Sequence, residues 1–135
     1  MVMRMNSINS QEELDLLKAD KIIDASASVY GVPREKVIGK RRFGRYIDAR
    51  HSAMKLTRDE TRLTYKKIAS MYSGRDHSTV ISAVKKIDGY LQYDQKYLNE
   101  YNALVKRYHE MMMAYKQEVI DMASQFEHIT DFLDQ

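Results

Sequence analysis

A repeat of apolar residues near the C-terminus limits the fold of this chain more than any other feature of its sequence. Apolar side chains recur in alternating steps of four and three from Ile87 to Leu133, and only Asp94 interrupts the series. A mean spacing of 3.5 residues over about six heptads is typical of a helix that packs along another helix. The repeat predicts a long helix over residues 92–135, with apolar positions Ile87, Leu91, Leu98, Tyr101, Val105, Tyr108, Met112, Tyr115, Val119, Met122, Phe126, Ile129 and Leu133.

This apolar stripe needs a surface to cover it. Residues 88–135 in one helix would measure about 70 Å, which is longer than a small domain can cover. The cover is either a helix of another chain or a fold-back of the same chain. Because no proline and no glycine after Gly89 interrupts the repeat, another chain is favoured, and we expect a homo-oligomer through residues 92–135. Tyrosines in the seam leave room for an antiparallel or larger bundle.

The chain before the repeat is also predicted to be helical, because one proline and five glycines among 135 residues leave few helix breakers. Ser10 starts a capping-box sequence at the beginning of a helix that ends near Gly31. Thr64 and Asp76 are expected to cap two helices that are separated by a glycine turn, which is the helix-turn-helix pattern. We expect an all-α fold in three segments. An N-terminal segment with the start of the first helix occupies 1–21, a helix-turn-helix domain occupies 22–91, and an oligomerisation helix occupies 92–135. Within the domain, shorter helices are expected over 33–38, 46–57, 65–72 and 77–87.

Positive charge is concentrated in the middle of the chain. The segment from Val32 to Lys86 holds 15 Lys and Arg against 5 Asp and Glu, whereas the rest of the chain holds 7 against 14. A basic middle between acidic flanks favours a polyanion as the partner of this middle segment.

Residues 73–80 read SGRDHSTV, which places charges, a histidine and hydroxyls at the start of an apolar helix. With Asp76 as N-cap, the next three residues fill the first helical turn, where helix-turn-helix modules contact base edges in the major groove. Their donors and acceptors suit base reading, and Arg75 can reach a phosphate or a guanine. An ordinary capped turn has the same spacing, so spacing alone leaves both interpretations open.

The amino-acid sequence of residues 73–80 favours base contacts in the major groove over an ordinary capped turn. SGRDHSTVISAVKKI resembles the signature GGRDHTTV of the last domain of the bacterial replication initiator DnaA, which continues into an apolar helix ending in KI. Upstream, YGVPREKVIGKRRFGRYIDARHSAM resembles the entry helix, the KRR-containing basic loop and the ARxxAM helix of that domain. The resemblance covers roughly Ile22 to Leu91 and implies sequence-preferring binding of double-stranded DNA.

By position, the resemblance implies that Arg42 enters the minor groove and that the turn 76–79 faces the major groove. Lys66 lies at a base-contacting helix start where the family often has proline, His51 stands where glutamine is common, and Ser73 replaces a glycine. We therefore expect base contacts from Arg42, Lys66, Asp76, His77, Ser78 and Thr79, and contacts with the DNA backbone from Lys40, Arg41, Arg45, Arg50, Arg58 and Arg75.

The sequence also departs from that family. DnaA proteins carry an ATPase module before this domain, and the sequence contains no GxxxxGK[ST] stretch. ATP-driven melting of DNA is therefore not expected, and neither is a nucleotide cofactor. The long C-terminal helix has no counterpart in the initiator domain. This combination is expected of a freestanding DNA-binding module with its own assembly helix, as in proteins of phages and mobile elements.

No catalytic, cofactor or metal site is predicted. The sequence shows no nucleophile–base arrangement, and His109 and His128 lack the spacing of metal ligands. Zero cysteines exclude disulfides and thiolate metal sites. Since there is neither a long apolar span nor a signal peptide, we expect a cytoplasmic protein, or a phage protein in the host cytoplasm.

Three uses of DNA binding remain open at this point. Recognition of a site in replication initiation or its regulation is the first hypothesis. The alternatives are a phage DNA-packaging recognition subunit that assembles into a ring, and a transcriptional regulator. A scaffold that keeps the fold but has lost DNA binding is a further possibility. A dimer favours the regulator, a ring favours packaging, and absence of DNA binding at low salt favours the scaffold.

Overall fold

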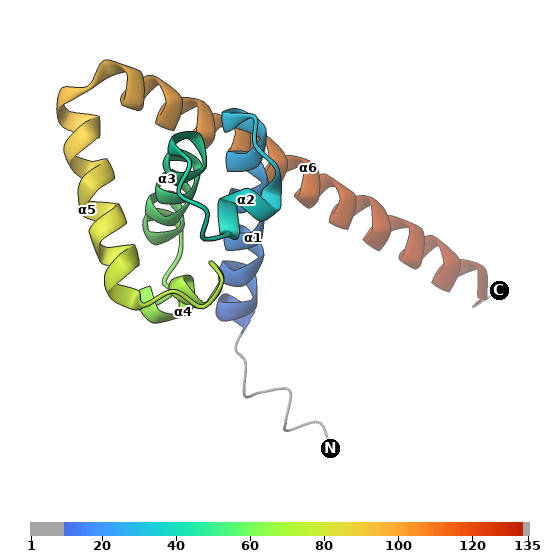
Figure 1. Ribbon diagram of the computed structural model, residues 1–135. Helices are drawn as coiled ribbons and strands as arrows, with labels where there is room; N and C mark the ends of the chain where they lie inside the picture. The colour runs from blue at the N-terminus through green and yellow to red at the C-terminus, as the bar shows by residue number, and fades with distance from the viewer. Residues whose placement is uncertain (1–9, 134–135) are drawn as a thin grey trace.

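The computed structural model describes residues 10–133, with side chains to Glu127, and this part of the chain is all-α, as predicted, with six helices and no strand (Figure 1). The helices are α1 (Ser10–Tyr30), α2 (Arg34–Ile38), α3 (Gly44–Glu60), α4 (Tyr65–Ser70), α5 (His77–Tyr93) and α6 (Gln95–Leu133).

The expected helix boundaries are set by capping residues. Gly31 ends α1 in the left-handed region at φ +66°, and the next amide, of Val32, donates to the carbonyl of Ala27, which is the Schellman arrangement. Thr64 caps α4 by accepting from the amide of Lys67. Ser10, the expected N-cap of the first helix, is instead the first residue of α1.

The helix-turn-helix is confirmed. Asp76 caps α5, since its Oδ1 accepts from the amide of Ser78 at 3.2 Å. Along α5, Val80, Val84 and Ile87 are buried, as the apolar pattern predicts. The helix runs to Tyr93 rather than ending near residue 87.

The expectation of one continuous C-terminal helix from residue 88 is wrong, because the helix is interrupted at Asp94, between α5 and α6. This residue has φ −124° and ψ 109°, outside the helical region. Its carboxylate Oδ1 accepts from the amides of Lys96 and Tyr97, at 2.9 and 3.4 Å, and so caps the new helix α6. In Figure 1, α6 turns back from the end of α5, crosses the domain beside α3 and α1, and extends beyond them.

The first half of α6 belongs to the hydrophobic core of the domain. Tyr101, Leu104, Tyr108 and Met112 are buried in one cluster with residues of α1, α3, α4 and α5. The cover for this half of the stripe is therefore the chain's own fold-back, not another chain. The core also continues past residue 91, where we expected the domain to end.

Polar contacts fix this half of α6 in place. The hydroxyls of Tyr97 and Tyr101 donate to the carboxylates of Asp48 and Asp59 on α3, each at 3.1 Å. Because each carboxylate lies at a different point of α3, the two bonds define both the position and the rotation of α6 on the domain.

The second half of α6, from Met113 onward, projects away from the domain (Figure 1). Its apolar side chains are largely in solvent, with Met122 69 % and Phe126 71 % exposed and Val119 45 % exposed. Ile129 and Leu133, the last positions of the repeat, lie outside the residues whose side chains are described.

Candidate nucleic-acid interface

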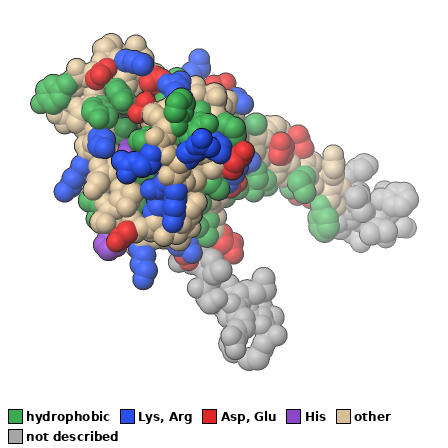
Figure 2. All heavy atoms as spheres, in the orientation of Figure 1, with side chains coloured by type: hydrophobic (Ala, Val, Ile, Leu, Met, Phe, Trp, Pro, Cys, Tyr) green, Lys and Arg blue, Asp and Glu red, His purple; other side chains and the backbone are tan. Residues whose placement is uncertain are grey.

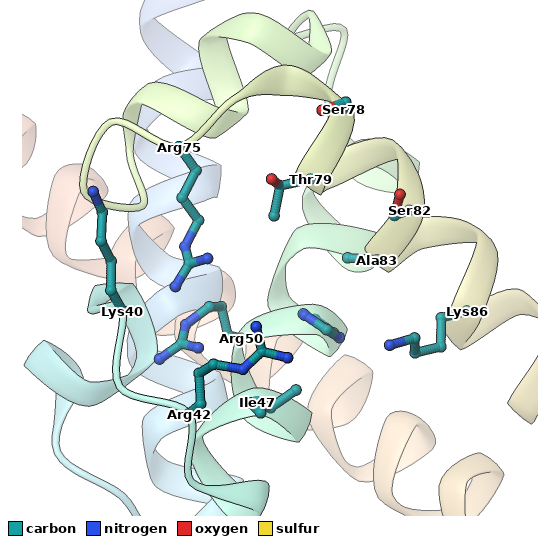
Figure 3. A pocket seen from close by; sticks show the side chains of 11 residues that line it. Lys40, Arg42, Ile47, Arg50, Arg75, Ser78, Thr79, Ser82, Ala83 and Lys86 are labelled. Carbon is teal, nitrogen blue, oxygen red and sulfur yellow. The ribbon is translucent and has the colours of Figure 1, made fainter.

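The basic loop between α2 and α3 lies opposite the start of α5, and the two enclose an open cavity of about 430 Å³ (Figure 3). Among the described residues that line this cavity, several are cationic and none is acidic. We call it the cationic cavity. Its lining consists of Lys40, Arg42, Ile47, Arg50, His51, Arg75, Ser78, Thr79, Ser82, Ala83 and Lys86.

Arg50 of α3 joins the end of α2 to the basic loop. Its guanidinium donates to the carbonyl oxygens of Val37, Lys36 and Arg41, at 2.9, 2.8 and 3.1 Å. The residue is only 2 % exposed, and burial together with nearby Arg75 lowers the pKa of Arg50 to about 10, so it stays charged at neutral pH. We expected a surface contact with the DNA backbone at this position, and the structure instead gives Arg50 a supporting role.

The turn before α5 is bonded to the same loop. Arg75 Nη2 donates to the carbonyl of Gly39 at 2.9 Å, and Ser73 Oγ donates to the carbonyl of Ile38 at 2.7 Å. Ser73 has φ +62°, a region that favours glycine, so its replacement of the family's glycine is not a neutral change. Its hydroxyl compensates for that strain by joining the turn to the loop.

Gly39 is needed for this contact. A Cβ on Gly39 would lie 2.8 Å from the backbone oxygen of Glu35, which is closer than such atoms approach. The turn is thus joined to the start of the basic loop through two backbone carbonyls, those of Ile38 and Gly39.

The residues expected to read bases are free to meet a ligand. Asp76, His77 and Ser78 are exposed at the tip of α5, and Thr79 is partly exposed on the wall of the cationic cavity. Nδ1 of His77 lies 3.0 Å from Oδ1 of Asp76. The hydrogen bond from the backbone amide of Ser78 lowers the pKa of Asp76, so this carboxylate remains ionised as a cap and as an acceptor.

The remaining basic residues divide into two groups. Lys40, Arg41 and Arg42 are exposed on the loop. Arg45 instead donates to the carbonyl of Tyr30 and pairs with Glu100 of α6, and Arg58 donates to Leu63 and lies over the ring of Tyr65, so both are engaged within the domain. Six of the twelve predicted site residues do not line the cationic cavity: Arg41, Arg45, Arg58, Lys66, Asp76 and His77.

Five residues that line the cavity were not among the predicted site residues, and three of them are polar: His51, Ser82 and Lys86. Ser82 and Lys86 follow Thr79 by three and seven positions, so helical periodicity places them on the same face of α5. That signal was available, and Lys86 could have been found from it. Figure 2 shows Lys and Arg side chains gathered over the front of the domain, with few on the projecting half of α6.

Comparison with known proteins assigns this arrangement to a family. The family described as the bacterial DnaA protein helix-turn-helix matches residues 19–87, which is just over half of the chain. The chain belongs to this family. It therefore contains a DnaA-type DNA-binding helix-turn-helix domain, as the motif in residues 73–80 indicated.

Several curated proteins that carry the name chromosomal replication initiator protein DnaA are similar to this chain. The chain is 34 % identical over 88 residues to the chromosomal replication initiator protein DnaA of Acholeplasma laidlawii. The aligned segment covers 65 % of this chain and 20 % of that protein. The chain is 36 % identical over 95 residues to DnaA 1 of Chlamydia trachomatis, covering 70 % and 21 %, and 36 % identical over 86 residues to DnaA 2 of Protochlamydia amoebophila, covering 64 % and 19 %. The chain thus spans about a fifth of the length of these relatives.

None of the helices in residues 10–133 is both long and apolar enough to cross a lipid bilayer. Within the same residues, no three His, Asp or Glu side chains come together as they do around a metal ion.

Proposed function

We propose that this protein binds double-stranded DNA with sequence preference through the two walls of the cationic cavity. The recognition turn at the start of α5 reads base edges in the major groove, and Arg42 of the basic loop reaches the adjacent minor groove. The observation that carries the proposal is the bonding of this loop to this turn by Arg75 and Ser73. Since the two are fixed relative to each other, they can address two grooves of one duplex at a defined spacing.

The proposal divides the contacts into two kinds. Asp76, His77, Ser78, Thr79, Lys66 and Arg42 contact bases and provide specificity, whereas Lys40, Arg41 and the neighbouring cations contact phosphates and provide affinity. Phosphate contacts release counterions, so binding should weaken steeply as salt increases.

Recognition of a site in replication initiation or its regulation is the use we favour, because the matched relatives carry the name chromosomal replication initiator. Transcriptional regulation and recognition of DNA in phage packaging are the alternatives. The oligomeric state separates them, since a dimer suits a regulator and a closed ring suits packaging.

The decisive experiment is a selection from random duplexes at fixed salt, followed by affinity measurements on variants. We expect His77→Ala to cost about 1–3 kcal/mol on the selected sequence and much less on random DNA, because a lost base contact affects only the correct base. Arg41→Gln is the matched control, and it should weaken both affinities by a similar factor.

A selection that returns no enriched sequence would argue against sequence preference. If His77→Ala lowered affinity equally on all duplexes, the assignment of the turn 76–79 to base reading would be wrong.

We also propose that the projecting half of α6 joins copies of this chain. Val119, Met122 and Phe126 continue the heptad spacing beyond Tyr115, which still lies against Lys21 of the domain. An exposed stripe with this spacing matches the seam of a helix that pairs with its own copy. The other large apolar side chains that are exposed in this segment, Met113 and Ile120, lie off the seam.

Val119→Asp should dissociate the oligomer, because it places a charge in the seam of the paired helices. Ser124→Asp is the matched control, since Ser124 is exposed on the opposite side of α6 and the same charge there faces water. Sedimentation at micromolar concentration measures both. A wild-type chain that sediments as a monomer would show that the projecting half of α6 does not join copies.

A further inference from the structure

His51, which stands where the resembling family commonly has glutamine, lines the cationic cavity. It lies on α3 directly after the supporting Arg50, is partly buried, and lines the cavity that the loop and α5 enclose. Cations act on it from each surrounding element: Lys86 from α5, Arg75 from the turn and Arg42 from the basic loop. Lys55, one turn further along α3, is paired with Asp59 and Asp88.

These surroundings keep His51 neutral in the free protein. Burial is the largest cause, and the charges of Lys86, Arg50, Arg75 and Arg42 add to it, so the pKa of His51 is lowered to about 4. An imidazole in the middle of several cations is therefore uncharged at neutral pH, although the cavity around it is built to attract an anion.

We propose that His51 is a proton-dependent contact for a phosphate group of the bound duplex, neutral in the free protein and protonated in the complex. The proposal rests on the proposed DNA binding, whose phosphates supply the anion. It adds a contact residue to the interface and makes the affinity for DNA depend on pH.

The chemistry of the two partners favours proton uptake. A phosphate oxygen only accepts hydrogen bonds, and a neutral imidazole has one donor and one acceptor, whereas a protonated imidazole has two donors. A phosphate in the cavity also offsets the repulsion from the four cations, which raises the pKa of His51 in the complex. A cavity of about 430 Å³ has room for a phosphate group beside the imidazole.

The direction of the pH effect follows from linkage. Between the low pKa of the free protein and the higher pKa of the complex, the complex binds more protons, so affinity rises as the pH falls. Above the pKa of the complex, His51 is neutral in both states and the dependence ends. The response is therefore confined to mildly acidic and neutral pH.

The experiment measures binding of a selected-sequence duplex at about pH 5.5 and about pH 7.5 in the same salt. For the wild-type protein we expect about fivefold to tenfold tighter binding at the lower pH. His51→Gln keeps a neutral hydrogen-bonding side chain of similar reach and should lose most of this response. His109→Gln removes a histidine of α6 that lies beside Glu60, outside the cationic cavity, and this variant should keep the response.

A second measurement does not depend on any variant. The ring protons of His51, followed by NMR in the wild-type protein, should titrate near pH 4 without DNA and more than about two units higher with it, which is the shift that a fivefold to tenfold change in affinity requires. An unchanged pKa on binding, or a pH response that persists in His51→Gln, would overturn the inference. A protein that fails to bind the duplex at either pH contradicts the proposed function itself, so the two failures are distinguishable.

Discussion

A chain that ends at Gln92 should lose its cooperative fold, whereas a chain that ends at Lys116 should keep it. The shorter chain retains every residue that matches the DnaA helix-turn-helix family, since that match ends at residue 87. It lacks the first half of α6, however, which lies in the same hydrophobic core as α1 and α3. This outcome differs from the independent domain over residues 22–91 that the sequence predicts.

The size of the effect follows from four buried side chains. Tyr101, Leu104, Tyr108 and Met112 are each at most 8 % exposed. Burying a large apolar side chain contributes about 1.5–3 kcal/mol, so together they contribute at least about 6 kcal/mol before correction for a compact unfolded state. Since domains of this size are stable by only about 5–15 kcal/mol, their removal is comparable to the whole stability.

Thermal unfolding followed by circular dichroism tests this prediction. The chain ending at Lys116 is the matched control, because it keeps the buried half of α6 and also Tyr115, whose ring lies 5.4 Å from Nζ of Lys21 on α1. A chain ending at Gln92 that melts cooperatively near the temperature of this control would show that α6 is dispensable for the core.

The two halves of α6 show what the repeat can and cannot predict. The long helix and its apolar face follow from periodicity alone, because side chains three and four positions apart share one face. The buried residues are Tyr101, Leu104, Tyr108 and Met112, whereas the 3.5-residue repeat named Val105, which is only partly buried. A straight helix on a globular surface has 3.6 residues per turn, so its buried face drifts away from a strict heptad. The repeat therefore predicts that one face of α6 packs against another surface, but it does not identify that surface.

The break at Asp94 was visible as the one interruption of the repeat. A short polar residue at such a point fits equally well as an exposed residue of a continuous helix and as the cap of a new one. The choice depends on whether α1 and α3 offer Tyr97 and Tyr101 the carboxylates and the apolar surface that they contact. Those partners are about 40–50 positions away in sequence, so no local sequence pattern shows whether Asp94 interrupts the helix.

The positions of candidate site residues could be predicted from the sequence where helix capping determines them. They could not be predicted where tertiary burial of a side chain determines its role. Asp76 caps α5 in the structure as its position in the motif requires. Arg41, Arg42 and Arg50 read alike in the sequence as basic residues of one segment, yet only Arg50 is buried. The difference arises because the end of α2 turns two carbonyls, and the basic loop one, toward the side chain of Arg50.

Arg50→Gln should therefore have two consequences that a surface arginine would not show. First, glutamine can donate to at most two of the three carbonyls that Arg50 holds, and it removes the charge that strengthens those bonds. Hydrogen bonds to charged groups contribute about 1.5–3 kcal/mol each, so we expect a loss of at least about 3 kcal/mol in unfolding free energy. Second, the basic loop loses its fixed conformation, so Arg42 no longer has a defined position relative to α5.

Arg41→Gln is the matched control for this experiment, because it removes one charge from the same loop at an exposed site. It should leave stability unchanged within about 0.5 kcal/mol, weaken DNA binding modestly and reduce the salt dependence by about one phosphate contact. Arg50→Gln is measured at a temperature where it remains folded, and it should lose more than about tenfold in affinity for the selected duplex. Its affinity for random DNA should fall much less, because a disordered loop still attracts phosphates but no longer holds Arg42 in a defined position. If Arg50→Gln matched Arg41→Gln in both stability and salt dependence, Arg50 would be a direct phosphate contact and the carbonyl bonds would not be what orders the loop.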